Sequence, residues 1–238
     1  MSSRVLIIIP AYNESECIEG VIAELRRDTP QYDYVVINDC STDNTKALLD
    51  SIGANYINLP TNLGIGGAVQ TGFRYAVERG YDVAVQLDGD GQHVPAYLPA
   101  IVEPVLNGWC DMCIGSRFIE KQGFQTSTMR RFGIKFLSAL IKITCGERVS
   151  DVTSGFRACS SRLCAHFAKD YAQDYPEPEA IMSALCHGFT VKEAAVVMRE
   201  RAGGRSSISP LKSVYYMIKV SLAIIIGRLT AGRSNKWM

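Results

Sequence analysis

The chain lacks any run of about 20 apolar residues, which a membrane-spanning helix requires. Its most apolar stretch near the C-terminus, residues 211–228, is interrupted by Lys212 and Lys219. The chain also lacks the features of an export signal. The opening apolar run, residues 5–9, follows one basic residue, stops at Pro10 and precedes no small-residue cleavage site. We therefore expect a cytoplasmic protein that begins with a buried strand and has no membrane span.

The chain also lacks a large net charge and any sign of export to a compartment where disulfide bonds form. With 25 basic and 24 acidic residues, the formal charge of +1 offers no general attraction for nucleic acid, and we expect no nucleic-acid partner. Eight cysteines without an export signal indicate reduced thiols. The Cys110 and Cys113 pair has no second pair at zinc-finger spacing, so two packed thiols are the favoured interpretation.

Apolar runs that are rich in β-forming residues alternate with helix-like stretches between residue 4 and about residue 115. The runs are apolar throughout, which is typical of strands in a mainly parallel sheet with helices on both faces. Five strands are predicted, at Val5–Ile9, Tyr34–Ile37, Tyr56–Leu59, Val83–Leu87 and Met112–Ile114. Ligands of such sheets bind beyond the carboxyl ends of the strands. The polar residues that follow the strands are therefore the first candidates for a site.

The most informative of these polar segments is Asp88-Gly-Asp-Gly-Gln92, which directly follows a predicted strand. Two carboxylates and an amide oxygen are hard ligands that suit Mg²⁺ or Mn²⁺. An EF-hand loop is excluded because His93 stands where that loop needs glycine at its sixth position. A solvated acidic turn is the alternative interpretation.

The glycine-rich segment 62–68 resembles a dinucleotide fingerprint only superficially. Val69 stands where the third small residue should be, and the first turn after a strand, residues 10–13, contains no glycine. We predict a loop that enters a helix and brings backbone amides near a nucleotide or diphosphate. Packing at the start of the helix is an equally good explanation.

The second half of the chain has glycine and arginine in its loops. Two helices are predicted there, at Phe132–Thr144 and Glu179–His187, and residues 211–228 are expected to form an amphipathic helix. That last helix would pack in the core or lie at a membrane interface.

Taken together, the motifs resemble family 2 glycosyltransferases of the GT-A fold, and more closely the dolichyl- or polyprenyl-phosphate sugar synthases. The resemblance covers about residues 4–208. It implies a Rossmann-like α/β domain at 1–208, with a nucleotide-sugar half at 1–115, an acceptor half at 116–208 and a C-terminal amphipathic helix and tail at 209–238. The motifs that carry it are Pro10-Ala-Tyr-Asn-Glu14, Asn38-Asp39-Cys-Ser-Thr-Asp43, Asn62-Leu-Gly64, Asp88-Gly-Asp90-Gly-Gln92, Gly115-Ser-Arg117, Asp151-Val-Thr-Ser-Gly-Phe-Arg157 and Arg201-Ala-Gly-Gly-Arg-Ser206.

The resemblance also implies roles for single residues. The nucleotide would be bound by Pro10, Tyr12, Glu14, Asp39, Gly64 and Asp88. A Mg²⁺ or Mn²⁺ ion would be held by Asp88, Asp90 and Gln92. Catalysis would involve Asp90, Arg117, Arg130, Arg131, Arg201 and Ser206, with the arginines on phosphates of donor or acceptor because a guanidinium pairs with phosphate in a bidentate manner. Any one of these arginines has the alternative of a surface or ion-pair residue.

This chain departs from the synthases in two places. Ser207 stands where they commonly have lysine after the RxxGxS signature. Many relatives also carry C-terminal membrane spans. The resemblance thus implies a peripheral enzyme at the cytoplasmic membrane face, attached through residues 211–228 or through a small membrane-protein partner.

The acceptor is predicted from what a nucleophile needs. A sugar hydroxyl normally needs a general base, and the chain has neither the Glu-Asp dipeptide nor the QxxRW signature of hydroxyl-using relatives. We therefore expect transfer from a nucleotide diphosphate sugar to a polyprenyl phosphate, and the family resemblance implies that the transfer proceeds with inversion. Transfer to a hydroxyl of a growing surface glycan is the alternative, with Glu177 or Glu179 as base, although both also fit the acidic first turn of a helix begun by proline. A nucleotidyltransferase and a non-catalytic sugar-nucleotide-binding domain also remain open.

Overall fold

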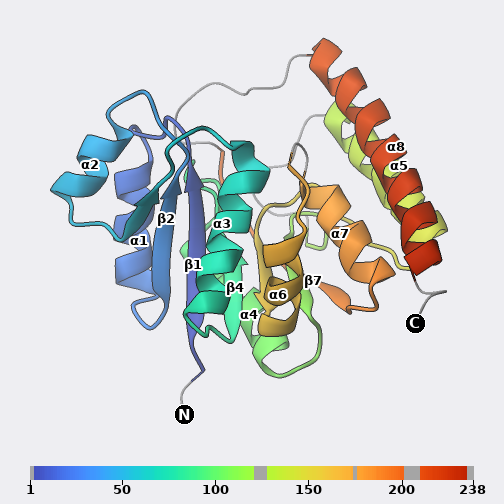
Figure 1. Cartoon of the computed structure of the whole chain (residues 1–238), viewed down its shortest axis with the longest axis horizontal. Helices are drawn as coiled ribbons and strands as arrows, with labels where there is room; N and C mark the ends of the chain where they lie inside the picture. The colour runs from blue at the N-terminus through green and yellow to red at the C-terminus, as the bar shows by residue number, and fades with distance from the viewer. Residues whose placement is uncertain (1–2, 121–127, 174–175, 201–209, 235–238) are drawn as a thin grey trace.

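A seven-stranded sheet runs through the centre of the computed structural model, which describes residues 3–120, 128–173, 176–200 and 210–234 (Figure 1). Side chains at 128–130, 210–215 and 229–234 lie outside the description. The strand order is β3-β2-β1-β4-β6-β5-β7. The strands are β1 (Val5–Ala11), β2 (Asp33–Asn38), β3 (Tyr56–Asn58), β4 (Val83–Gln86), β5 (Met112–Ser116), β6 (Arg157–Ser160) and β7 (Val191–Ala195). All five predicted strands are confirmed, with small differences at their ends.

Helices cover both faces of the sheet. One face carries α1 (Ile18–Asp28), α2 (Thr45–Ser51) and α4 (Leu98–Leu106), which follows a short 3₁₀ helix, η1 (Pro95–Tyr97). The other carries α3 (Gly64–Glu78), α5 (Thr128–Cys145), α6 (Ser161–Lys169), α7 (Pro176–Cys186) and α8 (Pro210–Ser234). Along β1, Leu6 and Ile8 enter one core, whereas Ile7 and Ile9 enter the other. This double burial is why the strand is apolar throughout.

Strand β6 is antiparallel to both of its neighbours, whereas every other pairing in the sheet is parallel. Gln86 at the end of β4 lies opposite Arg157 at the start of β6. The residues just before β6 therefore reach the same sheet edge as the carboxyl ends of β1, β2, β4 and β5. The sequence analysis did not predict β6 or β7, because one has four residues and the other carries Lys192 and Glu193.

The expected C-terminal helix is present as α8 and is longer than residues 211–228. It packs beside α5 and α7 (Figure 1). Val220 and Ile224 are buried in this contact, whereas Ile218 and Leu222 are exposed. The helix thus contributes to the core on one side and presents apolar residues to water on the other. Among the described residues, none of the helices is both long and apolar enough to cross a membrane.

Candidate active site

The loops after β1 and β2 are tied together at the carboxyl edge of the sheet. Asn13 has a left-handed backbone (φ 56°), and its side-chain oxygen accepts hydrogen bonds from the backbone of Thr42 (2.8 Å) and Asp43 (3.3 Å). The backbone N–H of Glu14 donates to the Thr45 hydroxyl at 3.0 Å. Tyr12 between them is about half exposed, and Pro10 is buried. The predicted nucleoside residues of this segment therefore lie on loops that are hydrogen-bonded to one another at this edge.

Asp39 connects this edge to the loop that enters α3. It is buried, and its Oδ1 accepts the backbone N–H of Leu63 at 2.7 Å, while its carbonyl accepts from Asn62 Nδ2 at 3.1 Å. Gly64 has φ +74°, a conformation that favours glycine. At Gly66, an added Cβ would lie 2.1 Å from the backbone oxygen of Ala172. Close packing at the helix start therefore explains Gly66, and nucleotide contact at Gly64 remains a prediction.

The Asp88–Gln92 turn follows β4 at the same edge and is fixed by hydrogen bonds from neighbouring residues. The Asp88 carboxylate is one-third exposed, and its Oδ1 accepts from Gln86 Nε2 at 3.1 Å. Asp90 is almost fully buried, and its Oδ1 accepts the backbone N–H of Gln92 at 3.0 Å. Gly155 packs so closely that an added Cβ would lie 2.9 Å from Asp88 Oδ2. The turn is therefore held by hydrogen bonds and close packing, and it is not a solvated loop.

These residues fit a hard divalent cation. They supply two carboxylates and one amide, all oxygen donors, and Mg²⁺ is usually held by one or two carboxylates together with substrate phosphates. In the described part of the chain there is no cluster of three or more His, Cys, Asp or Glu that would form a complete protein cage. That Asp88, Asp90 and Gln92 would hold such a cation remains a prediction.

His93 is part of the site, although the sequence analysis used it only to exclude an EF-hand. Its Nδ1 accepts the backbone N–H of Asp88 at 3.0 Å, so a neutral ring carries its proton on Nε2, which lies 3.7 Å from Asp88 Oδ2. The ring is buried and stacks on Phe156, with centroids 4.9 Å apart. A single histidine after an acidic turn gives no sequence signal for this role.

Arg117 and Arg131 meet on one aromatic ring. The guanidinium carbon of each lies 5.6 Å from the centroid of Phe118. Arg117 is buried and forms a bidentate ion pair with Asp151, with both N–O distances at 2.8 Å. Glu193 in turn accepts the backbone N–H of Asp151 at 2.8 Å. The ion-pair alternative considered for each arginine thus applies to Arg117, and a contact between Arg117 and phosphate remains a prediction.

A second buried arginine lies under the acidic turn. Arg157 is fully buried and donates to the carbonyl oxygens of Ser154 (2.5 Å) and Glu177 (3.2 Å), while its Nε has no partner in the described residues. Burial raises the pKa of the Tyr171 hydroxyl, and the charge of Arg157 opposes that rise.

Glu177 and Glu179 lie half-buried in the first turn of α7, which begins at Pro176 as expected.

The sequence matches the model of the family described as glycosyl transferase family 2 over residues 6–167, more than half of the chain. The chain belongs to glycosyl transferase family 2. Two relatives are polyprenol monophosphomannose synthase of Mycolicibacterium smegmatis, 30% identical over 98% of this chain and 91% of that protein, and undecaprenyl-phosphate mannosyltransferase of Micrococcus luteus, 37% identical over 65% of each. The family resemblance is therefore confirmed.

A solved structure of another glycosyltransferase shares the fold. Glucosyl-3-phosphoglycerate synthase of Mycobacterium tuberculosis, in complex with Mn²⁺, UDP and phosphoglyceric acid, aligns with a TM-score of 0.71 and 20% identity over 95% of this chain and 78% of that one. At this identity the likeness concerns the fold alone. It confirms the expected GT-A architecture.

The family 2 motifs meet at one edge of the sheet, but three predicted residues cannot be placed there. Arg201 and Ser206 lie outside the described residues, and Arg130 lies in α5 with its side chain outside the description. Arg199, from the same basic segment as Arg201, forms an ion pair with Glu24 at 2.8 Å.

Cys110 and Cys113 are both buried free thiols, as expected. The sequence analysis assigned no role to Gln86, which appears as an ordinary residue of a predicted strand, or to Arg157, which it named only as the end of a motif.

Proposed function

We propose that this family 2 glycosyltransferase moves a sugar from a nucleotide diphosphate sugar to a polyprenyl phosphate, with inversion, at the cytoplasmic face of a membrane. The observation that carries the proposal is the meeting of an acidic turn with two arginines at one sheet edge. Gly155 abuts the Asp88 carboxylate, and Asp151 of the same loop holds Arg117 beside Phe118 and Arg131. The names of both relatives support a polyprenyl-phosphate acceptor.

The donor would lie along the tied loops. Pro10, Tyr12 and Glu14 would border the nucleoside together with Asp39, whose backbone N–H donates to the carbonyl of Ala11 at 2.9 Å. Gly64 lies at the start of α3, in the loop that Asp39 holds. Asp39 uses Oδ1 for Leu63, which leaves Oδ2 to accept an N–H of the base. Asp88, Asp90 and Gln92 would hold Mg²⁺ or Mn²⁺. A metal there neutralises charge on the departing diphosphate.

The acceptor needs no general base. A phosphate monoester has its second pKa near 6, so its oxygen is already an anionic nucleophile near pH 7. The difficulty is instead repulsion between an anionic nucleophile and an anionic donor. Arg131, with Arg130, Arg201 and Ser206 as further predicted contacts, would offset that repulsion, since charge-assisted bonds to phosphate are strong. Arg117 would add its positive charge from its position beside Asp151.

The lipid acceptor also requires the protein to reach a membrane. The exposed apolar side of α8 supports peripheral attachment through this helix, and a small membrane-protein partner that covers it is the other route considered.

The test is product analysis. The full chain is incubated with a panel of nucleotide sugars, Mg²⁺ or Mn²⁺, and undecaprenyl phosphate in detergent, and both products are identified by mass spectrometry. We expect a nucleoside diphosphate and a polyprenyl phosphosugar. Release of pyrophosphate would indicate a nucleotidyltransferase, and binding without turnover would indicate a sugar-nucleotide-binding domain. Turnover with a glycan acceptor alone would replace the lipid by a hydroxyl.

A further inference from the structure

Helices α5 and α8 lie side by side and contain only one sign of charge (Figure 1). Neither contains an aspartate or glutamate, yet together they carry eight of the 25 basic residues of the chain. Subtracting these eight leaves 17 basic residues against 24 acidic ones in the rest of the chain. A nearly neutral protein thus has a distinctly cationic pair of helices on one side of its sheet.

The same two helices expose large apolar side chains. On α5, Phe132 is 75% exposed, Phe136 48% and Ile143 82%, and their spacing places them on one side of the helix. On α8, Ile218 is 58% exposed and Ile226 57%. Leu222 and Ile225 are also exposed. We call these seven residues the apolar stripe. Apolar residues gathered in this way mark an interaction surface.

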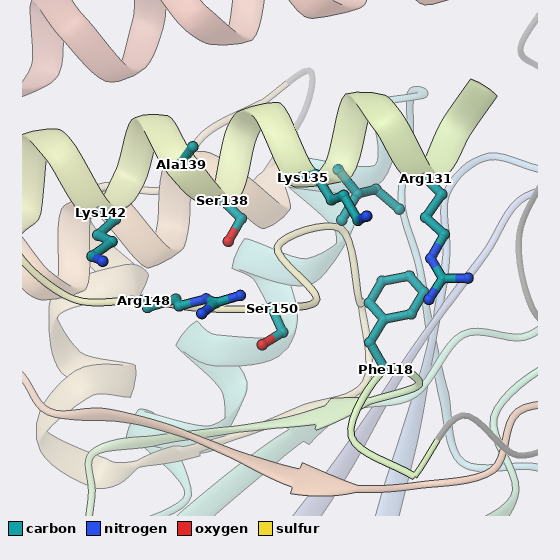
Figure 2. Close-up of a pocket in the computed structure, with 9 residues that line it drawn as sticks. Phe118, Arg131, Lys135, Ser138, Ala139, Lys142, Arg148 and Ser150 are labelled. Atoms are coloured by element: carbon teal, nitrogen blue, oxygen red, sulfur yellow. The ribbon is translucent and has the colours of Figure 1, made fainter. Parts of the chain in front are cut away.

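A basic pocket with a volume of about 570 Å³ lies along α5. It is lined by four cations, Arg131, Lys135, Lys142 and Arg148, together with Ser138 and Ser150 (Figure 2). Figure 2 shows Arg131 and Phe118 at one end, Lys142 and Arg148 at the other, and Lys135 between them. The described residues that line it include no acidic side chain.

Arg131 is joined in the pocket by three further cations, whose charges have no acidic partner in the part of the chain that the structure describes. Among the described residues, neither Lys135, Lys142 nor Arg148 takes part in an ion pair. From Arg131 to Lys142 the helix rises by roughly 16 Å, at about 1.5 Å per residue. One phosphate group cannot contact both ends at once. The pocket therefore has room for a second anion besides any phosphate at Arg131.

We propose that Lys135, Lys142 and Arg148 of this pocket bind headgroup phosphates of anionic phospholipids, and that this binding seats the apolar stripe in the membrane interface. The bilayer is favoured over a protein partner because one surface explains both observations: it offers apolar depth for the stripe and negative charge for the cations. The site goes beyond the proposed function, since these lipids are not substrates. It would place the Arg131 end of the pocket at the depth where a polyprenyl phosphate presents its own phosphate.

The first test measures binding of the purified full chain to vesicles. Phosphatidylcholine vesicles are compared with vesicles of equal parts phosphatidylcholine and phosphatidylglycerol in a sedimentation assay. We expect binding to the mixed vesicles that weakens as salt is added. The combined Lys135→Ala, Lys142→Ala and Arg148→Ala variant should bind at least about tenfold more weakly, because each cation near an anionic surface contributes. Lys169→Ala, which removes an exposed cation of α6, is the matched control and should bind normally.

The second test addresses the apolar stripe. Phe132→Ser with Ile143→Ser should weaken vesicle binding while leaving thermal unfolding unchanged, because both side chains are largely exposed. Trp109→Ser is the control, since Trp109 is 62% exposed and follows α4 on the other face of the sheet. Equal binding to both vesicle types, or no binding at all, overturns the proposal.

Three further outcomes would also overturn it. If the triple cation variant binds vesicles normally but loses turnover of detergent-solubilised polyprenyl phosphate, the whole pocket belongs to the acceptor. If the stripe variant changes the mass of the protein in solution and leaves vesicle binding intact, the stripe is an interface between two copies of this chain. Inorganic phosphate that competes with mixed vesicles at low concentration would identify the site as one for a free anion.

Discussion

The carboxyl edge of the sheet and the α5–α8 pair present their charged groups in opposite ways. At the edge, Asn13, Asp39 and Asp88 are each fixed by hydrogen bonds to neighbouring loops, and Asp90 is buried. Along α5, cations line a pocket without ion pairs among the described residues, and both α5 and α8 present apolar side chains to water. A diphosphate is a small anion whose reacting bond must be oriented, and it therefore rewards groups held in place beforehand. A lipid surface has no fixed shape and rewards a broad cationic and apolar face.

The sharpest way to break this comparison is to remove the buried carboxylate of the edge. Asp90→Ala should lower kcat about a thousandfold or more, since a catalytic metal supplies several kcal/mol of charge stabilisation. The fold should persist because Asp90 lies in a turn, which a thermal melt would check. Asp28→Ala, at an exposed carboxylate paired with Arg27, is the control. Undiminished activity in chelator would contradict the metal assignment.

At the boundary between the two regions, Arg131→Ala should cost about 2 to 4 kcal/mol of transition-state stabilisation, or roughly 30- to 1000-fold in kcat/KM. The same is expected of Arg201→Ala. Arg131→Lys should recover part of the loss, because it keeps the charge but not the planar group over Phe118. Arg74→Ala on α3 serves as the control. The measurement uses the lipid acceptor with saturating donor, and a tolerant Arg131→Ala would favour a hydroxyl acceptor.

A smaller effect is expected from a substitution that displaces Asp88 but removes none of the proposed metal ligands. Gly155→Ala would place a Cβ 2.9 Å from Asp88 Oδ2 and displace that carboxylate. We expect activity to fall about ten- to a hundredfold, as for other misplaced catalytic groups, and half-maximal activity to need more Mg²⁺ or Mn²⁺. Gly20→Ala in α1, where an added Cβ meets nothing within 4 Å, should be neutral. An unchanged metal titration in Gly155→Ala would show that the position of Asp88 is not critical.

The smallest effect is expected at the acidic first turn of α7. Glu177→Gln and Glu179→Gln should each keep at least about a tenth of wild-type activity. Removal of a general base would lower the rate much further, by about 10²- to 10⁴-fold. The assay requires the lipid acceptor at saturating donor. Collapse of either variant, together with a tolerant Arg201→Ala, would move the nucleophile from a lipid phosphate to a glycan hydroxyl.

Much of the edge was predictable because parallel strands place their following residues together. Asp39 and Asp88, 49 positions apart, could be brought to one site from the apolar runs alone. The position of His93 could not, since its role depends on a backbone N–H at Asp88 and a stacked ring at Phe156. Nor could the insertion of β6, because a four-residue strand that contains a buried arginine has no hydrophobic periodicity. The ion pair that buries Arg117 likewise depends on a distant residue, Asp151.

The antiparallel insertion of β6 has a consequence for how the enzyme is made. Strand β4 has β1 on one side, but its other neighbour is β6, whose register partner for Gln86 is 71 residues further along the chain. Until residues 157–160 have left the ribosome, β4 is an exposed edge and Gly155 cannot support Asp88. Such long-range pairing makes folding slow and leaves strand edges open to aggregation. The nascent chain would therefore acquire its acidic turn well before it could acquire a working site.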